Sequence, residues 1–271
     1  MACSAPPQAP SSPPASTTSS PSDAVARPRI VAHRGASHDA PENTLAAFRR
    51  AWELGVECVE LDVRLTRDGE VVVIHDATTR RTAGVDRPVA EQTLAELRAH
   101  DAGRWKSEAF AGERIPTIAE AMATIPRGRT MFIEIKSGVE TAPAVARAIA
   151  AADPRPRGAL LALQGYDAAA LSTFAAELTG APAYWTLDPK RDEHDRSEPY
   201  PVALVAEAKR LGFAGLALDH IAVTPALLAA AREAGVIVDV WTINDAPTLA
   251  HWSGTDVRWI ETDRPDLAPA R

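Results

Sequence analysis

Four polar side chains stand at spacings that could support chemistry. His33 and Arg34 follow a short apolar strand, and Glu60 and Asp62 lie two residues apart in the strand-like run 57–63. Side chains alternate between the faces of a strand, so the two carboxylates point the same way. Carboxylates on one face of an apolar strand repel each other and resist burial, and a bound cation would remove both costs.

Two later segments carry the same kinds of side chain after apolar runs. His75 follows residues 71–74, and Glu134 and Lys136 follow residues 130–133. Glu134 and Lys136 again share one strand face. The chain therefore offers two histidines, three carboxylates, an arginine and a lysine, nearly all where a strand ends.

This set of groups is typical of metal-assisted phosphoryl transfer. Glu60, Asp62 and Glu134 are oxygen ligands, which suit Mg²⁺ or Ca²⁺ better than Zn²⁺. The arginine and the lysine beside such an ion indicate an anionic substrate, and a guanidinium matches the geometry of phosphate. Two histidines from different elements suit one general base and one general acid. The alternative is that Glu60 and Asp62 form ion pairs with Arg64 and Lys136 and hold no metal.

The composition is that of an ordinary globular chain. Its 271 residues, 46% hydrophobic and 24% charged, can form one large α/β domain or two small ones. The net charge of −7 argues against a non-specific nucleic-acid binder. No run approaches the roughly 18 apolar residues of a transmembrane helix. We expect a small-molecule substrate, no nucleic-acid partner and no transmembrane segment.

The N-terminal segment, residues 1–27, is rich in Pro, Ser, Ala and Thr. It has almost no large apolar side chains to bury, so it predicts a disordered linker, and it lacks the apolar core of a signal peptide. Its first four residues nevertheless resemble a bacterial lipoprotein just after the lipid-attachment signal, with Cys3 as the lipidated residue. We expect an exported bacterial protein, periplasmic or anchored through Cys3. A cytoplasmic location is the alternative.

From Arg29 onward the sequence alternates between strand and helix patterns. Strands are expected near 30–33, 57–63, 71–75, 131–135, 159–163, 182–186, 214–218, 236–241 and 257–261. Helices are expected near 43–54, 93–99, 117–124, 141–152, 167–179, 202–211, 224–234 and 246–253. Thr93 and Thr117 each precede a glutamate by three residues, which predicts a capping box at both helix starts.

The spacing of the strands indicates the fold. The connection between strands 57–63 and 71–75 is too short for a parallel crossover, so these two strands must form an antiparallel hairpin. Without 71–75, eight strands remain in βα order, as in a (β/α)8 TIM barrel. We predict an α/β domain over residues 28–271, a TIM barrel with a small insertion at 76–115, after the second barrel strand.

A TIM barrel would collect the reactive groups on one face, because active sites lie where the strands end. The residues that map there are His33, Glu60, Asp62, His75, Glu134, Lys136, Trp241 and Asn244. This convergence predicts one site rather than scattered polar residues.

At these positions the chain resembles the glycerophosphodiester phosphodiesterase family. The matching motifs are Ala32-His33-Arg34-Gly35, Pro41-Glu42-Asn43-Thr44, Glu60-Leu61-Asp62, Asp68-Gly69 with His75-Asp76, Glu134-Ile135-Lys136, Trp241-Thr242-Ile243-Asn244 and Thr262-Asp263-Arg264-Pro265. Each motif alone is weak, but the ordered series over residues 30–265 is specific.

The resemblance implies a TIM barrel that hydrolyses glycerophosphodiesters to sn-glycerol 3-phosphate and an alcohol with a divalent cation, in lipid and glycerol metabolism. It also implies roles for single residues, namely His33 and His75 as the catalytic pair, Glu60, Asp62 and Glu134 as metal ligands, Arg34 and Lys136 as phosphate-binding cations, Glu42 as a polar partner of the first histidine, and Trp241 as a wall of the glycerol site.

One departure from the family and two other functions stay open. Gln164 stands where the family often has serine, so the preferred alcohol is not fixed. The other functions are phospholipase D-like activity on lysophospholipids and non-catalytic binding of a phosphodiester.

Overall fold

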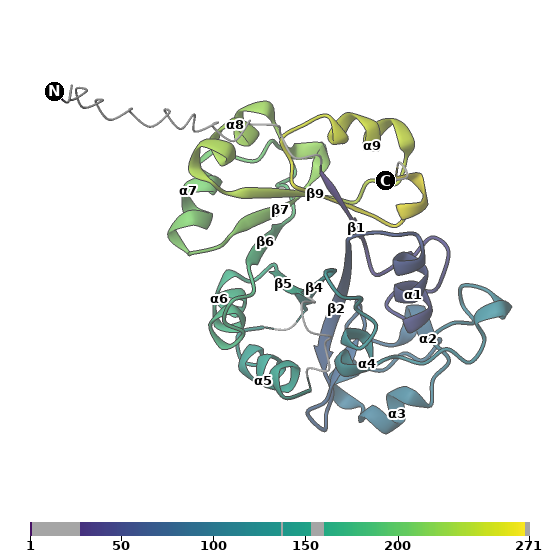
Figure 1. Ribbon diagram of the computed structural model, residues 1–271. Helices are drawn as coiled ribbons and strands as arrows, with labels where there is room; N and C mark the ends of the chain where they lie inside the picture. Colours follow the sequence, from purple (N-terminus) through teal and green to yellow (C-terminus); the bar gives the residue numbers. More distant parts are fainter. Residues whose placement is uncertain (2–27, 137, 153–159, 269–271) are drawn as a thin grey trace.

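Eight parallel strands close into a barrel with helices around it (Figure 1). The computed structural model describes residue 1 and residues 28–136, 138–152 and 160–268. The barrel strands are β1 (Arg29–Ala32), β2 (Cys58–Leu65), β4 (Thr130–Ile135), β5 (Leu160–Gly165), β6 (Ala183–Leu187), β7 (Gly215–Asp219), β8 (Ile237–Trp241) and β9 (Trp259–Thr262). Strand β1 pairs with both β9 and β2, which closes the ring. The predicted TIM barrel is confirmed.

A further strand, β3 (Val71–Val73), lies outside the ring. It pairs with β2 in antiparallel fashion, with Val73 opposite Val63 and Val71 opposite Leu65. The predicted hairpin is therefore confirmed. Because β3 runs back toward the level of the β2 carboxylates, His75, two residues beyond its end, is delivered to the same end of the barrel.

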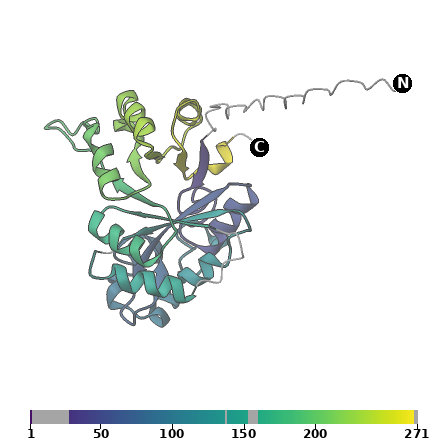
Figure 2. The same cartoon turned by 60° about the vertical axis from the view of Figure 1, so that its left-hand side comes forward.

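Helices cover the outside of the barrel in both views (Figures 1 and 2). They are α1 (Leu45–Glu53), α4 (Ile118–Met122), α5 (Ala142–Ala152), α6 (Ala168–Glu177), α7 (Ala203–Arg210), α8 (Pro225–Ala234) and α9 (Ala246–Ser253), with short 3₁₀ turns η3 (His220–Ala222) and η4 (Pro265–Leu267). Thr117 caps α4 through a reciprocal bond with Glu120, as its spacing predicts.

The segment between β3 and α4 holds short elements only. These are α2 (Arg80–Ala83), η1 (Val89–Glu91), α3 (Leu94–Arg98) and η2 (Glu108–Phe110). Thr93 begins α3 with the predicted capping box. A small apolar cluster that includes Val72, Val89, Leu97 and Ile115 holds this segment against β3.

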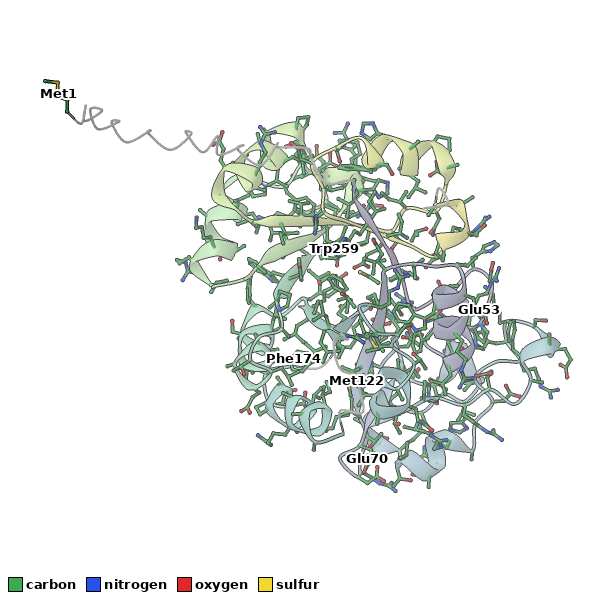
Figure 3. The ribbon with its side chains drawn as sticks, viewed as in Figure 1. Met1, Glu53, Glu70, Met122, Phe174 and Trp259 are labelled. Carbon is green, nitrogen blue, oxygen red and sulfur yellow. The ribbon has the colours of Figure 1, made fainter. Side chains whose placement is uncertain are left out.

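Apolar side chains fill both sides of the barrel wall. Phe174 and Met122 pack between the strands and the outer helices (Figure 3), and burying a side chain of this size contributes roughly 1.5–3 kcal/mol. The lower barrel interior is filled by Val31, Cys58, Phe132, Ala162, Tyr184, Ala217 and Trp259. This apolar plug leaves the strand C-terminal ends as the place where polar groups gather inside the barrel.

The structure gives little information on the N-terminal segment and on attachment to a membrane. The predicted linker, apart from Met1, and the predicted lipid site at Cys3 lie outside the described residues. Among the helices of the described segments, none has the length and apolar character needed to cross a bilayer.

Gly35 forms the turn that follows His33 and Arg34. Its φ of +83° lies in the left-handed region, and a Cβ there would lie 2.7 Å from the backbone carbon of Ala47 in α1. The next residue, Ala36, donates its N–H to the Ala47 carbonyl at 3.0 Å. The lack of a side chain therefore lets this turn lie directly on α1 and fixes the two functional side chains at the barrel mouth.

The Gly35→Ala variant should lower the free energy of unfolding more than Gly55→Ala does. Gly55 has a similar φ of +80° with nothing within 4 Å of the added Cβ, so we expect a loss of about 1 kcal/mol there. Gly35→Ala adds an overlap with backbone and should cost about 2–5 kcal/mol in total. Urea denaturation of both variants measures the difference, and equal losses would contradict a tight contact at Gly35.

Candidate active site

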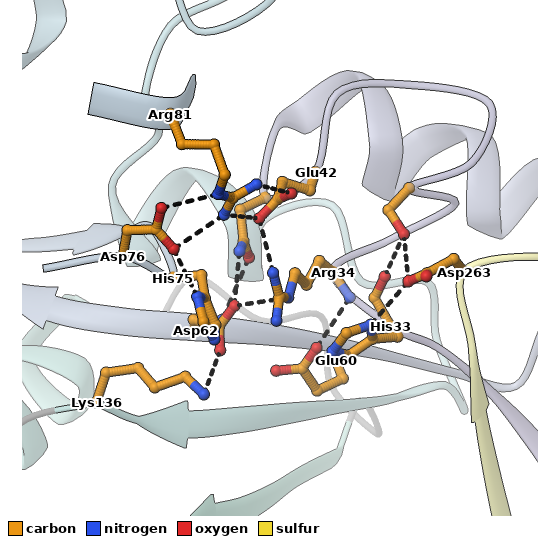
Figure 4. A network of polar contacts seen from close by, with 12 residues as sticks. His33, Arg34, Glu42, Glu60, Asp62, His75, Asp76, Arg81, Lys136 and Asp263 are labelled. Carbon is orange, nitrogen blue, oxygen red and sulfur yellow. Dashed lines mark hydrogen bonds and ion pairs between the residues drawn. The ribbon is translucent and has the colours of Figure 1, made fainter. Parts of the chain in front are cut away.

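The ends of the strands bring the predicted residues together (Figure 4). His33 directly follows β1, Glu60 and Asp62 lie within β2, and Glu134 lies near the end of β4. His75 comes from the segment after β3. Parallel barrel strands end on one face, which explains why residues so far apart in sequence meet.

Three buried carboxylates form the centre of the site. Glu60, Asp62 and Glu134 each contribute an oxygen to a group whose atoms lie within 4.8 Å of one another, and their exposed fractions are 0%, 1% and 8%. Asn43 supports this group, because its Nδ2 donates to Asp62 Oδ2 at 2.7 Å. One oxygen of Glu60, Oε1, is buried without a hydrogen-bond partner in the described residues.

Ionising all three carboxylates in this buried space requires positive charge nearby. Burial raises the pKa of Glu60 well above its ordinary value, and the charge of Asp62 raises it further. Burial also raises the pKa of Glu134, against the influence of Lys136. Burial would raise the pKa of Asp62 too, but Lys136 and Arg34 outweigh it and hold the pKa low. A divalent cation among these oxygens would let all three carboxylates ionise.

Two cations already face the carboxylates. Lys136 Nζ lies 2.7 Å from Glu134 Oε1 and 3.2 Å from Asp62 Oδ1, and Arg34 Nε lies 3.4 Å from Asp62 Oδ2. Of the ion pairs in the predicted alternative, which gave Glu60 and Asp62 the partners Arg64 and Lys136, the described residues contain the one between Asp62 and Lys136. Arg64 donates instead to the backbone oxygens of His75 and Lys136, at 2.9 and 3.0 Å.

A carboxylate orients His33. Its Nδ1 lies 2.7 Å from Asp263 Oδ1, and Asp263 also accepts hydrogen bonds from Ser37 Oγ at 2.8 Å and Asn244 Nδ2 at 2.7 Å. Burial would raise the pKa of Asp263, but the hydrogen bond to His33 and these two donors hold the pKa low. With Nδ1 engaged, Nε2 is the His33 nitrogen left for a reacting group.

His75 is oriented in the same way by its neighbour. Its Nδ1 lies 2.8 Å from Asp76 Oδ1, so Asp76 has an orienting position. Burial lowers the pKa of the His75 imidazole, with Arg34 and Lys136 contributing in the same direction against the charge of Asp62. The neutral imidazole, which can accept a proton, is favoured as a result.

Arg81 joins the two halves of the site (Figure 4). Its guanidinium binds Asp76 at 2.8 and 3.0 Å and Glu42 at 2.6 and 2.8 Å. Glu42 in turn accepts from Arg34 at 2.9 Å. The sequence predicted a polar role for Glu42 beside the first histidine, and the structure pairs it with the two arginines. Arg81 was missed, because no motif marks it within the insertion.

Two cavities meet at His33 and Arg34. The inner one, about 90 Å³, is lined by Glu134, Lys136, Trp241 and His75 among others. The outer one, about 500 Å³, extends from His33 toward Lys106. Trp241 lies on the wall of the inner cavity, and its buried Nε1 has no hydrogen-bond partner in the described residues. Its role beside the glycerol stays a prediction.

A second set of buried acids lies at the floor of the inner cavity. Gln164 Nε2 donates to Asp239 Oδ2 at 3.0 Å and to Glu261 Oε1 at 2.7 Å. Burial raises the pKa of both acids, and the charge of Asp239 raises the pKa of Glu261 further. Oδ1 of Asp239 is buried without a hydrogen-bond partner in the described residues. The sequence analysis missed both acids. A pattern that could have revealed them is their spacing: each lies in a strand two residues before a residue of the barrel mouth, so the two share a strand face.

The chain matches one family over nearly all of the described barrel. The glycerophosphoryl diester phosphodiesterase family matches residues 33–267. A glycerophosphodiester phosphodiesterase from Caldanaerobacter subterraneus is 34% identical over 242 residues, which is 88% of this chain and 94% of the relative. A putative enzyme of the same kind from Bacillus subtilis is 30% identical over 252 residues, 88% and 95% of the two chains.

Solved structures agree with this family match. The phosphodiesterase of Oleispira antarctica in complex with sn-glycerol-3-phosphate superposes with a TM-score of 0.78 at 28% identity and covers 88% of this chain and 94% of that one. A putative glycerophosphoryl diester phosphodiesterase from Silicibacter pomeroyi superposes with a TM-score of 0.74 at 28% identity, covering 89% and 91%.

The buried acid Asp239 should make the metal-free protein less stable as pH rises. Burial raises its pKa to about 7 from an ordinary 3.8. Its contribution to stability is thus complete below about pH 4 and is lost as pH rises through 7, on the order of 2–4 kcal/mol. Asp239→Asn should flatten this loss between pH 5 and 8, measured by urea unfolding in EDTA. The exposed Asp256→Asn is the matched control, and parallel pH curves for wild type and Asp239→Asn would contradict the assignment.

Proposed function

This chain belongs to the glycerophosphoryl diester phosphodiesterase family and is therefore a phosphoric diester hydrolase, and we propose that it hydrolyses glycerophosphodiesters to sn-glycerol 3-phosphate and an alcohol. The observation that most supports this is the inner cavity, which is lined by two carboxylate-oriented histidines, two cations and Glu134. Glu60 and Asp62 converge with Glu134 at its wall. The relative from Oleispira antarctica holds sn-glycerol-3-phosphate as its product.

Glu60, Asp62 and Glu134 would hold the divalent cation, Mg²⁺ or Ca²⁺. The three residues offer only oxygen donors, and the buried Oε1 of Glu60 lacks a hydrogen-bond partner in the described residues, so the donor set fits a hard cation. Such an ion would supply positive charge that offsets the phosphate and the developing transition state.

Lys136 and Arg34 would bind the phosphate. Both line the inner cavity, and both already sit beside carboxylates. When those carboxylates bind a metal ion, the lysine and arginine N–H groups become available to phosphate oxygens. Fixed cations of this kind stabilise charge in the transition state without having to reorganise during the reaction.

His33 and His75 would transfer the protons. The reaction forms a P–O bond to the nucleophile and breaks the P–O bond to the leaving alcohol. The nucleophile is water, or the glycerol 2-hydroxyl with water then opening the cyclic phosphate. Of the two cavities described, His33 borders both and His75 only the inner one. We therefore assign acceptance of the nucleophile's proton to His75 and donation to the leaving oxygen to His33.

Hydrolysis of glycerophosphocholine and glycerophosphoethanolamine tests this proposal. EDTA should abolish release of glycerol 3-phosphate, and added Mg²⁺ or Ca²⁺ should restore it. Glu134→Gln removes one charged ligand and should require at least tenfold more metal for half-maximal activity, because losing a ligand contact of 1.4 kcal/mol changes binding about tenfold. Full turnover in EDTA would contradict a metal role. Turnover of lysophospholipids alone would favour the phospholipase D-like alternative, and binding without turnover would favour the non-catalytic one.

Replacing either histidine should lower kcat while the protein stays folded. His33→Ala and His75→Ala should each reduce kcat about 10²–10⁴-fold, the range for a lost general acid or base. Asp263→Asn should reduce it less, about 10–100-fold, because the imidazole remains but its partner is changed. His194→Ala, on an exposed loop, is the control. Steady-state kinetics with circular dichroism measures both properties, and full activity of a folded His33→Ala enzyme would exclude its role.

A further inference from the structure

The outer cavity carries a lysine whose charge no carboxylate offsets. Lys106 Nζ donates to the backbone oxygen of Ser37 at 2.7 Å and faces the ring of Trp105 at 6.0 Å. Among the ion pairs of the described residues, none includes Lys106. An ammonium has three N–H donors, so two remain for a ligand in this cavity.

The carboxylates in the cavity wall are already engaged. Glu42 accepts from both Arg34 and Arg81, and Asp263 accepts from His33, Ser37 and Asn244. Two arginines also line this cavity: Arg34 is paired with Glu42, and Arg264 is paired with Asp266 at 2.8 and 2.9 Å. Lys106 therefore dominates the charge that a ligand would meet here.

The backbone around Lys106 is fixed, unlike that of an ordinary surface lysine. The Asp101 carboxylate accepts the N–H groups of Gly103, Arg104 and Gly112, each at 2.9 Å. A Cβ on Gly103 would lie 2.0 Å from the Phe110 carbonyl oxygen, so the backbone at Gly103 packs directly against the backbone at Phe110. Trp105 Nε1 donates to Ala102 O at 2.9 Å. The loop holds the ammonium in place before a ligand arrives.

The two cavities correspond to the two arms of a phosphodiester. A phosphate at His33 and Arg34 would place one ester arm in the inner cavity, beside Lys136 and Trp241, and the other in the outer cavity. The inner cavity, at about 90 Å³, has room for a group the size of glycerol, whereas the outer one, at about 500 Å³, accommodates a larger alcohol.

We propose that the outer cavity binds the leaving alcohol and that Lys106 selects alcohols bearing an anionic group, a carboxylate or a phosphate. The proposal rests on the hydrolysis of glycerophosphodiesters proposed above. A carboxylate near Lys106 gains a charge-assisted hydrogen bond, whereas a quaternary ammonium is repelled and finds the Trp105 ring already facing the lysine.

Glycerophosphoserine and glycerophosphoethanolamine test the proposal, because their alcohols differ only by one carboxylate. We expect wild-type kcat/KM to favour glycerophosphoserine about tenfold, the effect of one hydrogen bond to a charged group. Lys106→Met should bring the ratio of the two kcat/KM values close to one, and Lys106→Arg should keep most of it. Lys209→Met is the matched control, since Lys209 also donates to a backbone carbonyl, Ala234 O at 2.9 Å, on a distant helix.

The outcomes separate this proposal from the hydrolase function. A wild-type ratio near one, or an unchanged ratio in Lys106→Met, would overturn the role of Lys106 even with an active enzyme. If neither diester is hydrolysed, the hydrolase function is contradicted, and the ratio of the two dissociation constants from calorimetry decides the role of Lys106 by the same tenfold criterion.

Discussion

The site depends on three carboxylates brought together in a buried space. Glu60, Asp62 and Glu134 come from two neighbouring strands, and parallel pairing puts Asp62 directly opposite Glu134. Their mutual repulsion and lost hydration would destabilise the barrel mouth unless positive charge offsets them. Lys136 and Arg34 supply part of that charge, and a divalent cation would supply the rest. The same charge that balances the acids also prepares the site for a phosphate.

The two histidines are held from opposite sides by separate networks. His33 in the first βα loop depends on Asp263, which follows the last strand, so closure of the barrel between β1 and β9 sets its ring. His75 depends on Asp76 and through it on Arg81 in the insertion. The insertion thus supports one of the two proposed catalytic histidines and also forms part of the wall of the outer cavity, because it fixes the His75 imidazole and carries Lys106.

The barrel interior changes character along its axis. Its lower part is apolar and aromatic, whereas Gln164, Asp239 and Glu261 form a buried polar set just below the proposed catalytic groups. The Gln164 amide donates to both acids, and Oδ1 of Asp239 has no hydrogen-bond partner in the described residues. Glu261 lines the inner cavity and lies close to Glu60, so the polarity of the site extends one step deeper than the proposed metal ligands.

Residue spacing along the chain was enough to predict the barrel strands and the group of residues that could form a site. Strand spacing predicted the barrel and the β2–β3 hairpin, because a seven-residue connection, 64–70, cannot form a parallel crossover, and same-face spacing paired Glu60 with Asp62. Which of these groups contact one another could be seen only in the folded structure. The bonds from Asp263 to His33, from Arg81 to Glu42 and from Gln164 to Asp239 join residues between 39 and 230 positions apart. Local patterns encode periodicity and turns, whereas such contacts arise only when the ring closes and the insertion folds over it.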